Sequence, residues 1–485
     1  MNNLDYFLKK YAFYIFLLAT FVVMLFRVPF WDETHAFEIA SLKLNEIFYL
    51  TRIEGHPILW YLILKPFTNI KLYPYSMLFI NWIFTSTAVY ILFKKAHFSY
   101  VVKTLIAYST PFLLYFAPVA RCYGIGILLL FLICTYHPKR FKRPYVYSSL
   151  IVFASQTSLT AMIGVFYIGL IYLYELIVRI RKNLIPKKVL ISVFFIFLLT
   201  ALFTISEFAG VKAYSDNNYM QSYYYMCYFM SLFESLNITP FLLRFFCWSA
   251  VLGFPYFMFK YSRKALFFIA STFLTMLAVF IFAYPGGYWN FFWFFVWFIV
   301  CMWLYGKKQL KIKYIKYNFI LILIFMIFPY AVLNTNNFQI VYASNSKKIA
   351  DYISGKIEYK NAKLYTLDWW SDISPSSDIY LKQKGIKLYN MQNVERGSFE
   401  DIKNIFQYWF KVKITDFDEF MLNVPEDFYI LTDTRFQFEK FKDCNIKIEK
   451  NADINIKTRK RSYLLKAVDI TPNKLNLIIY KVIKL

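Results

Sequence analysis

The sequence predicts an α-helical polytopic membrane protein with about eleven transmembrane helices, followed by an α/β domain outside the membrane. Of the 485 residues, 59% are hydrophobic and 22% are aromatic, which exceeds the share in soluble domains. The apolar residues gather in runs of about 20, long enough for one helix to cross a bilayer. The segment from residue 334 onward lacks such runs and is rich in Lys, Asp, Asn and Ser.

The apolar runs predict the positions of the spans. The first run is long and no small-residue cleavage site follows it, so we expect a retained span and not a cleaved signal peptide. A short polar turn, SQTSLT, is all that divides the fifth run from the sixth. The runs lie at residues 11–28, 76–93, 101–117, 121–136, 145–160, 161–178, 189–207, 239–259, 265–283, 289–305 and 317–333.

The charges predict the orientation of these spans. The formal net charge is +26, and the basic residues cluster in every second connection, the pattern of cytoplasmic loops. We therefore expect a multi-pass membrane protein with a cytoplasmic N-terminus and a C-terminal domain on the opposite side. In a bacterium this would be the inner (plasma) membrane, with the C-terminal domain periplasmic or extracellular. Basic residues in this arrangement set topology and contact anionic membrane lipid, so nucleic acid is not an expected partner. The basic clusters lie at residues 9–10, 93–103, 137–144, 179–188, 260–264 and 306–316.

The first outer loop combines apolar helices with ionisable residues. Residues 36–50 repeat apolar side chains at helical spacing, which predicts one amphipathic helix in the membrane interface. The run ILWYLILKPF, residues 58–67, is too short to span and predicts a second interfacial helix. Two polar clusters flank the first helix: Asp32, Glu33 and His35 before it, and Arg52, Glu54 and His56 after it. Ionisable groups at a membrane boundary are costly and indicate function.

The two acidic residues at the start of the loop are the candidate catalytic residues. A carboxylate can accept a proton from a hydroxyl group, helped by partial burial that raises its pKa. We place Asp32 ahead of Glu33 in this role. The alternative role for Asp32 is the N-cap of a helix that begins near Thr34.

The second cluster offers substrate or metal contacts. Glu54 and His56 are candidate ligands of a divalent metal ion, and with Arg52 they are candidate substrate-binding residues. Polar contacts within the loop are an equally good explanation. The six cysteines form no CxxC pair, so we expect no role for them in metal or redox chemistry.

Further candidate substrate-binding residues begin two later spans. In ARCYGIGILLL, residues 120–130, Arg121 can hold a phosphate through two parallel hydrogen bonds, although a snorkelling Arg that anchors the helix end is the alternative. Tyr123 follows two residues later. The rings of Tyr288 and of the Tyr-rich segment 213–229 suit sugar stacking, and anchoring at the membrane interface is the favoured alternative for them.

The order of these features resembles the GT-C superfamily of membrane glycosyltransferases, in particular the protein O-mannosyltransferase and aminoarabinose transferase group. The resemblance rests on the acidic pair after the first span, two juxtamembrane helices, the His-Pro motif at 56–57, Arg-x-Tyr at 121–123 and YPGGYW at 284–289. It covers about residues 1–333, which we expect to form the transmembrane GT-C-like catalytic domain, with the extracytoplasmic α/β domain at 334–485.

The resemblance implies a function. The donor would be a sugar linked to polyprenyl phosphate, and the acceptor would be a hydroxyl of a glycan, a lipid or a protein outside the cytoplasm. Asp32, or Glu33 by a shift of one residue, would be the base, and transfer would invert the anomeric centre. Some relatives carry a second acidic residue near the position of Arg121, and this sequence has none there.

Two other functions are alternatives: a lipid-linked glycan transporter or flippase, and a non-catalytic cell-envelope assembly protein. Transporters place ionisable residues within their spans and contain internal repeats, and this sequence has few of the former and none of the latter. In the C-terminal segment, residues 346–357 and 398–410 are predicted to be helices. Strands are predicted at 363–370, 386–391, 427–433, 462–470 and 475–483. The segment contains no nucleotide-binding motif.

Overall fold

The computed structural model of the chain divides into two compact units. The helical unit comprises Met1–Leu25, Gly55–Trp60 and Leu78–Phe338, and the loop–tail unit comprises Phe26–Glu54, Tyr61–Met77 and Gln339–Leu485. The predicted domain boundary at 333/334 lies outside the described residues. The structure describes residues 3–26, 29, 31–69, 72–109, 111–208, 262–282, 288–306, 346–360, 362–366, 376–390, 394–408, 428–433, 446–457 and 474–484.

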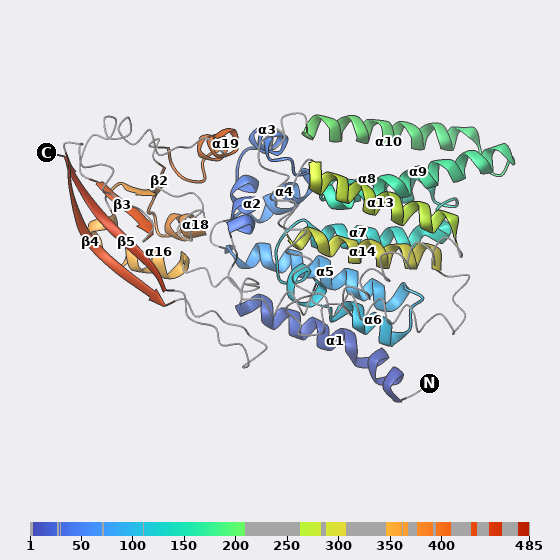
Figure 1. The fold of residues 1–485 in the computed structure, drawn as a ribbon, viewed down its shortest axis with the longest axis horizontal. Coiled ribbons are helices and arrows are strands. Elements are labelled where there is room, and N and C mark those ends of the chain that lie inside the picture. The colour runs from blue at the N-terminus through green and yellow to red at the C-terminus, as the bar shows by residue number, and fades with distance from the viewer. Residues whose placement is uncertain are drawn as a thin grey trace. The chain divides into compact units, whose positions relative to one another are not determined.

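The helical unit is a bundle of apolar helices (Figure 1). Its described helices are α1 (Asn3–Phe26), α5 (Tyr75–Lys95), α6 (Tyr100–Ala107), α7 (Tyr123–Tyr136), α8 (Pro144–Ser155), α9 (Leu159–Arg181), α10 (Lys187–Phe208), α13 (Arg263–Phe282) and α14 (Tyr288–Tyr305). Among the described helices, α1, α5, α9, α10 and α13 are long and apolar enough to cross a membrane. They indicate a membrane-embedded protein. The total of eleven spans stays a prediction, because the runs at 239–259 and 317–333 lie outside the described residues.

The aromatic helix α14 forms much of the core of this unit. The side chains of Trp293 and Trp297 are fully buried, and the Trp297 indole donates to the Thr160 carbonyl at 3.0 Å. A Cβ atom at Gly164 of α9 would lie 2.3 Å from the Trp297 ring. Glycine is therefore needed at residue 164 for α9 and α14 to approach closely.

Helix α10 presents a different surface. It leaves large apolar side chains exposed along its length, namely Ile191, Phe194, Phe195, Leu199, Leu202 and Ile205. Exposed apolar area of this extent is unfavourable in water. It is the surface expected of a helix that contacts lipid acyl chains.

The run predicted as one span at 101–117 is instead broken. Helix α6 ends at Ala107, and a short π-helical turn, η3 (Pro111–Phe116), follows. Proline has no backbone N–H and interrupts helical hydrogen bonding. The freed carbonyls are bonded by α5: the Asn81 amide donates to Phe116, Ala117 and Val119, and the Thr85 hydroxyl donates to Phe116.

The described residues between α1 and α5 form the helices α2 (Trp31–Ser41), α3 (Leu44–Glu54) and α4 (Leu59–Leu64) and the 3-10 turn η1 (Lys65–Phe67). The prediction of one helix over residues 36–50 is therefore wrong. The helix stops at Ser41, and the Lys65 ammonium donates to the Leu42 carbonyl in the break. Helix α3 then begins with Glu46 accepting from the Lys43 N–H at 2.8 Å, as in a capping box.

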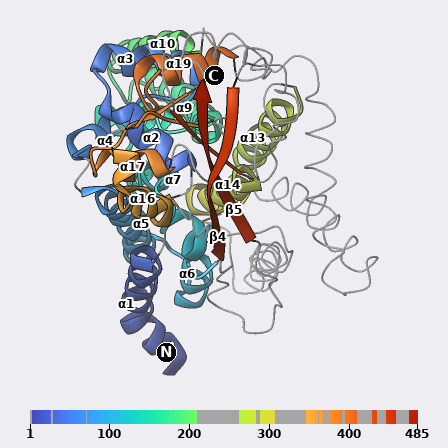
Figure 2. The same cartoon turned by 90° about the vertical axis from the view of Figure 1, so that its left-hand side faces the viewer.

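The C-terminal segment contains a five-stranded sheet in the order β2-β1-β3-β5-β4. Pairing is parallel from β2 through β1 to β3 and antiparallel from β3 through β5 to β4, and Figure 2 shows the long β4–β5 pair. The strands are β1 (Leu364–Thr366), β2 (Leu388–Tyr389), β3 (Phe428–Asp433), β4 (Ile446–Lys457) and β5 (Lys474–Lys484). The helices are α16 (Ser346–Ser354), α17 (Ile357–Lys360), α18 (Ser376–Lys382) and α19 (Phe399–Tyr408).

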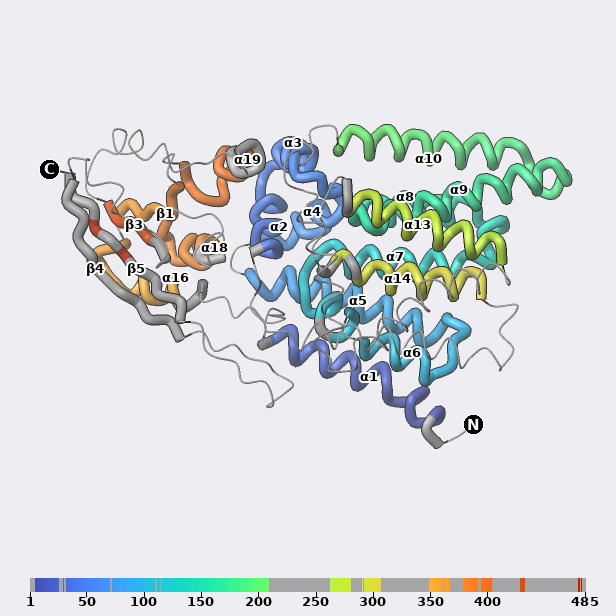
Figure 3. Tube along the Cα trace, viewed as in Figure 1, coloured from blue at the N-terminus to red at the C-terminus, as the bar shows by residue number. Residues whose placement is uncertain are grey.

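The loop and the C-terminal segment pack against each other within the loop–tail unit. Figure 3 shows α18 beside α2 and α19 beside α3. The Tyr49 ring of α3 meets the Phe399 ring of α19 edge-on, with centroids 5.6 Å apart. The first loop is thus held by the last third of the chain.

Candidate functional site

The predicted site residues fall in both units, and each group has its own surroundings. Asp32, Glu33, Arg52 and Glu54 belong to the loop–tail unit. His56, Arg121, Tyr123 and Tyr288 belong to the helical unit.

The two candidate catalytic carboxylates differ in exposure. Helix α2 begins at Trp31, so Asp32 and Glu33 both lie in its first turn, where negative charge interacts favourably with the helix dipole. Asp32 therefore does not cap a helix that begins near Thr34. Asp32 is half-buried, whereas Glu33 is fully buried. Of the two, Asp32 is the carboxylate that is partly accessible from outside the protein.

Contacts on the far side of α2 fix the orientation of this turn. The hydroxyls of Thr34 and Tyr73 are 2.9 Å apart in a hydrogen bond, and the Phe37 and Tyr73 rings have centroids 5.1 Å apart. Burial raises the pKa of the Tyr73 phenol well above its usual range, so Tyr73 stays neutral. These contacts hold one face of α2 and leave Asp32 on another.

The second predicted cluster is spread out. Arg52 is exposed in the last turn of α3, and Glu54 accepts a short hydrogen bond from the Tyr61 hydroxyl. Among the residues that the structure describes, no group of three or more His, Cys, Asp and Glu side chains is arranged to hold a metal ion. The metal role of Glu54 and His56 stays a prediction.

Arg121 lies inside the helical unit. Its side chain is buried, with 6% exposed, and its Nη2 atom lies 3.4 Å from His56 Nε2. It lies two residues before the start of α7, at the end of the segment whose carbonyls are bonded by Asn81. Burial does not fit a snorkelling Arg, whose guanidinium would reach the surface. The position of the guanidinium is instead set by the irregular segment between η3 and α7.

Tyr123 is packed into the core beside this arginine. Its hydroxyl donates to Asn290 Oδ1 at 3.5 Å, and its ring meets the Trp293 ring at a centroid distance of 5.9 Å. Only 4% of Tyr123 is exposed, so its ring supports the fold here. Tyr288 is the first residue of α14, and its side chain lies outside the described residues.

One buried acid near His56 was missed by sequence reasoning. Glu207, near the end of α10, is 3% exposed, and its Oε1 accepts the Ile58 N–H at 3.0 Å. Residues 56–58 therefore contact Arg121 through His56 and Glu207 through Ile58. The signal was present, because a lone carboxylate in an otherwise apolar helix is a functional hypothesis by default. Our predicted span ended at 207, which placed this residue at a helix end.

The helical unit thus gathers a guanidinium, an imidazole and a carboxylate around one short segment. A buried guanidinium can make charge-assisted, bidentate hydrogen bonds to phosphate. The carboxylate near the backbone of Ile58 holds the segment, and with it the imidazole, in place.

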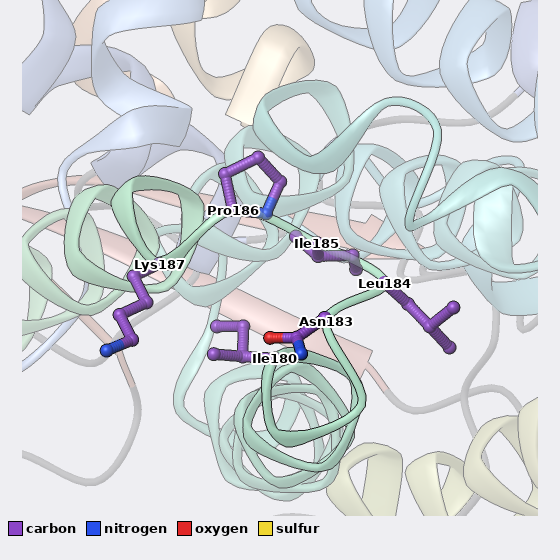
Figure 4. Close-up of a pocket in the computed structure, with 6 residues that line it drawn as sticks. All are labelled: Ile180, Asn183, Leu184, Ile185, Pro186 and Lys187. Atoms are coloured by element: carbon purple, nitrogen blue, oxygen red, sulfur yellow. The ribbon is translucent and has the colours of Figure 1, made fainter.

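A pocket of the helical unit lies elsewhere. It is formed by the turn between α9 and α10 (Figure 4) and lined by Ile180, Asn183, Leu184, Ile185, Pro186 and Lys187. At 1.5 Å per residue, α10 separates Lys187 from Glu207 by about 30 Å. None of the predicted site residues lines this pocket.

Comparison with known proteins does not assign the chain to a family. No protein-family model matches the chain, and no curated protein matches it significantly. The resemblance to GT-C glycosyltransferases therefore rests on the motifs of the sequence alone.

Proposed function

We propose that the protein is an integral-membrane glycosyltransferase of GT-C type. It transfers a sugar from a polyprenyl-phosphate donor in the bacterial inner membrane to an acceptor hydroxyl of a glycan, lipid or protein at the extracytoplasmic face. The C-terminal α/β domain lies on that face. Five long apolar helices support embedding in a membrane, where a polyprenyl donor resides.

One observation supports this proposal most strongly. Of two adjacent carboxylates in the first turn of α2, Asp32 is half-buried and Glu33 is fully buried. A general base must reach the proton that it removes. Asp32 meets this requirement, whereas Glu33 is enclosed by protein.

The proposed reaction is a single displacement. The acceptor oxygen attacks the anomeric carbon while Asp32 accepts the hydroxyl proton. The bond between the anomeric carbon and the phosphate oxygen breaks, its electron pair leaves with polyprenyl phosphate, and the configuration inverts. We assign Arg121 to the phosphate, because a guanidinium stabilises the charge that develops on the leaving oxygen.

The test compares the two carboxylates in the purified protein, reconstituted in vesicles with polyprenyl-phosphate mannose or aminoarabinose as donors. Asp32→Asn removes the base, and we expect transfer to fall about 100-fold or more, the contribution typical of a general base. Glu33→Gln is the matched control and should retain more activity than Asp32→Asn. A folded Asp32→Asn variant with full activity would refute the assignment, and a larger loss in Glu33→Gln would transfer it to Glu33.

A lipid-linked glycan transporter remains the second candidate, and one observation favours it. The segment from α6 to η3 is a broken helix, and transporters build their substrate sites from discontinuous helices. Such a protein would move its donor across the membrane intact, without breaking the bond between sugar and phosphate.

A further inference from the structure

Beyond the candidate site, α2 enters a buried group of charges contributed by the C-terminal segment. We call it the Glu38 cluster. The three carboxylates and the arginine of this cluster are each at most 5% exposed, and the Lys382 side chain is 19% exposed. The members are Glu38 of α2, Asp378 and Lys382 of α18, Arg396, and Asp401 of α19.

Short contacts join the C-terminal members. Lys382 Nζ lies 2.6 Å from Asp378 Oδ2 and donates to the Arg396 carbonyl at 2.6 Å. The Arg396 guanidinium donates to Asp401 at 3.2 Å, and the Gly397 N–H donates to the other Asp401 oxygen at 3.0 Å. α18 and the start of α19 therefore form a rigid acceptor for Glu38.

Glu38 reaches the centre of this group. A Cβ atom at Gly397 would lie 2.8 Å from Lys382 Nζ, 2.9 Å from Glu38 Oε1 and 3.0 Å from Asp378 Oδ2. Three charged atoms from two helices thus converge on the space that a side chain would fill. Gly397 also has a φ of +67°, a conformation that favours glycine.

Burial raises the pKa of both carboxyl groups at the centre. It raises the pKa of Glu38 to about 8, although the Lys382 charge lowers it. It also raises the pKa of Asp378, against the same lysine. Burial therefore favours the protonated, neutral form of these carboxyl groups.

The spacing on α2 relates this contact to the proposed base. At 100° per residue, Thr34, Phe37 and Glu38 share one face of the helix, and Asp32 lies on the opposite side. Thr34 and Phe37 contact Tyr73, whose ring meets the Tyr380 ring of α18 at 5.4 Å. Fixing that face fixes the direction in which Asp32 points.

We propose that Glu38 is a positioning residue whose buried carboxyl group, which converges with Asp378 and Lys382 at Gly397, anchors α2 to the C-terminal segment and so orients Asp32 for proton transfer. The inference rests on the proposed function for the role of Asp32. It assigns the C-terminal segment a task in the reaction, because a small displacement of a catalytic group is costly in rate. Removing one member of a buried charge group leaves its partners uncompensated, so the anchor depends on Glu38.

The experiment uses the full-length protein in detergent or vesicles. Glu38→Leu removes the contact, and Glu38→Gln keeps a neutral group that can hydrogen-bond with Asp378. Asp351→Asn is the control, because it removes an exposed pair with Lys384 in the same segment. Amide hydrogen exchange of residues 31–41 reports on anchoring, with α9 as internal reference, and kcat and donor KM report on orientation.

For Glu38→Leu we expect amide exchange in α2 to accelerate and kcat to fall, each by about tenfold or more, with donor KM unchanged. Asp351→Asn should resemble the wild type in both readouts, and Glu38→Gln should retain kcat and show exchange in α2 no faster than that of the wild type. Unchanged exchange of α2 in Glu38→Leu would overturn the anchor, and faster exchange with an unchanged kcat would overturn the positioning role. If the wild type transfers no sugar, the proposed function fails, and the exchange result still decides the anchor.

The pH dependence of anchoring separates the wild type from Glu38→Gln. When α2 is released, Glu38 meets water and titrates near its ordinary pKa, whereas the anchored state keeps the proton to higher pH. The stabilisation is therefore full below about pH 4.5 and is lost as the pH rises toward 8. After correction for intrinsic rates, exchange in α2 should accelerate more steeply over this range in the wild type than in Glu38→Gln, which retains only the Asp378 carboxyl group, and equal slopes would contradict the raised pKa of Glu38. The charged and titratable groups around Glu38 are His35, Tyr73, Asp378, Lys382, Arg396 and Asp401.

Discussion

At the scale of single residues, neighbouring charged side chains differ in how deeply they are buried. Glu33 is fully buried and Asp32 half-buried in the same helical turn. Arg121 is buried beside His56 and not displayed at a helix end. Arg121 is the residue to which we assign the donor phosphate in the proposed function, because a guanidinium can form bidentate hydrogen bonds to phosphate.

Replacement of Arg121 tests this role. Arg121→Lys keeps the charge and loses the bidentate geometry, and Arg121→Ala loses both. We expect binding of polyprenyl phosphate to weaken about 10- to 100-fold in Arg121→Ala, which corresponds to one charge-assisted hydrogen bond, with a smaller loss in Arg121→Lys. Binding can be measured with radiolabelled polyprenyl phosphate.

Arg52→Ala is the matched control, because Arg52 is exposed and should matter less. Equal affinities of the wild type and Arg121→Ala would show that Arg121 does not hold the phosphate.

Part of the site could be predicted from the sequence. The acidic pair, the His-Pro motif and Arg121 stand out because they are local patterns next to apolar runs. Glu38 and Asp378 could not be paired, since 340 residues separate them in the sequence and each belongs to an ordinary helical pattern. Glu207 was missed although its apolar setting was visible.

At the scale of elements, the break between α6 and η3 positions the start of α7. Three carbonyls that a continuous helix would bond internally are bonded by Asn81, which satisfies buried groups that would otherwise be costly. Asn81 fits because residue 124 is glycine: a Cβ atom there would lie 2.4 Å from Asn81 Oδ1 and 2.7 Å from Thr85 Oγ1.

Gly124→Ala therefore should destabilise the protein. Overpacking of this kind costs about 1–3 kcal/mol, and displacement of Asn81 would leave backbone carbonyls unpaired. We expect a lower midpoint of thermal unfolding in detergent. Gly169→Ala is the matched control in a helix interior, because its Cβ would meet its nearest neighbour, the Phe197 ring, at an ordinary 3.5 Å. Equal midpoints for the two variants would show that Asn81 tolerates the added methyl group.

The prediction of helices and strands succeeded where one periodic pattern dominates a segment. It failed where contacts with residues distant in the sequence determine the local structure. The strands β1, β2 and β3 fall within predicted ranges, and α16 and α19 match predicted helices. The split of α2 from α3 was missed, because Lys65 from a later segment bonds the carbonyl at the break. β4 was missed because IKIEKNADINIK is rich in charges, although its alternation of apolar and polar residues was a usable signal.

At the scale of the whole molecule, the chain is organised as a helical unit and a loop–tail unit, and the first loop belongs to the latter. Hydropathy predicts which segments are apolar, and five long helices agree with it. It does not predict which distant segments pair, because those contacts depend on the shapes of folded surfaces. The loop that carries Asp32 is therefore built by residues from both ends of the sequence.

The most direct test of the proposed function asks what becomes of the donor. The protein is reconstituted in vesicles with polyprenyl phosphate that carries a labelled sugar, together with an extract of envelope acceptors. Mass spectrometry then measures free polyprenyl phosphate and the labelled acceptor. The account predicts acceptor-dependent release of polyprenyl phosphate and an inverted glycosidic linkage, both lost in Asp32→Asn. Movement of intact donor between leaflets without its cleavage would contradict the account and establish a transporter.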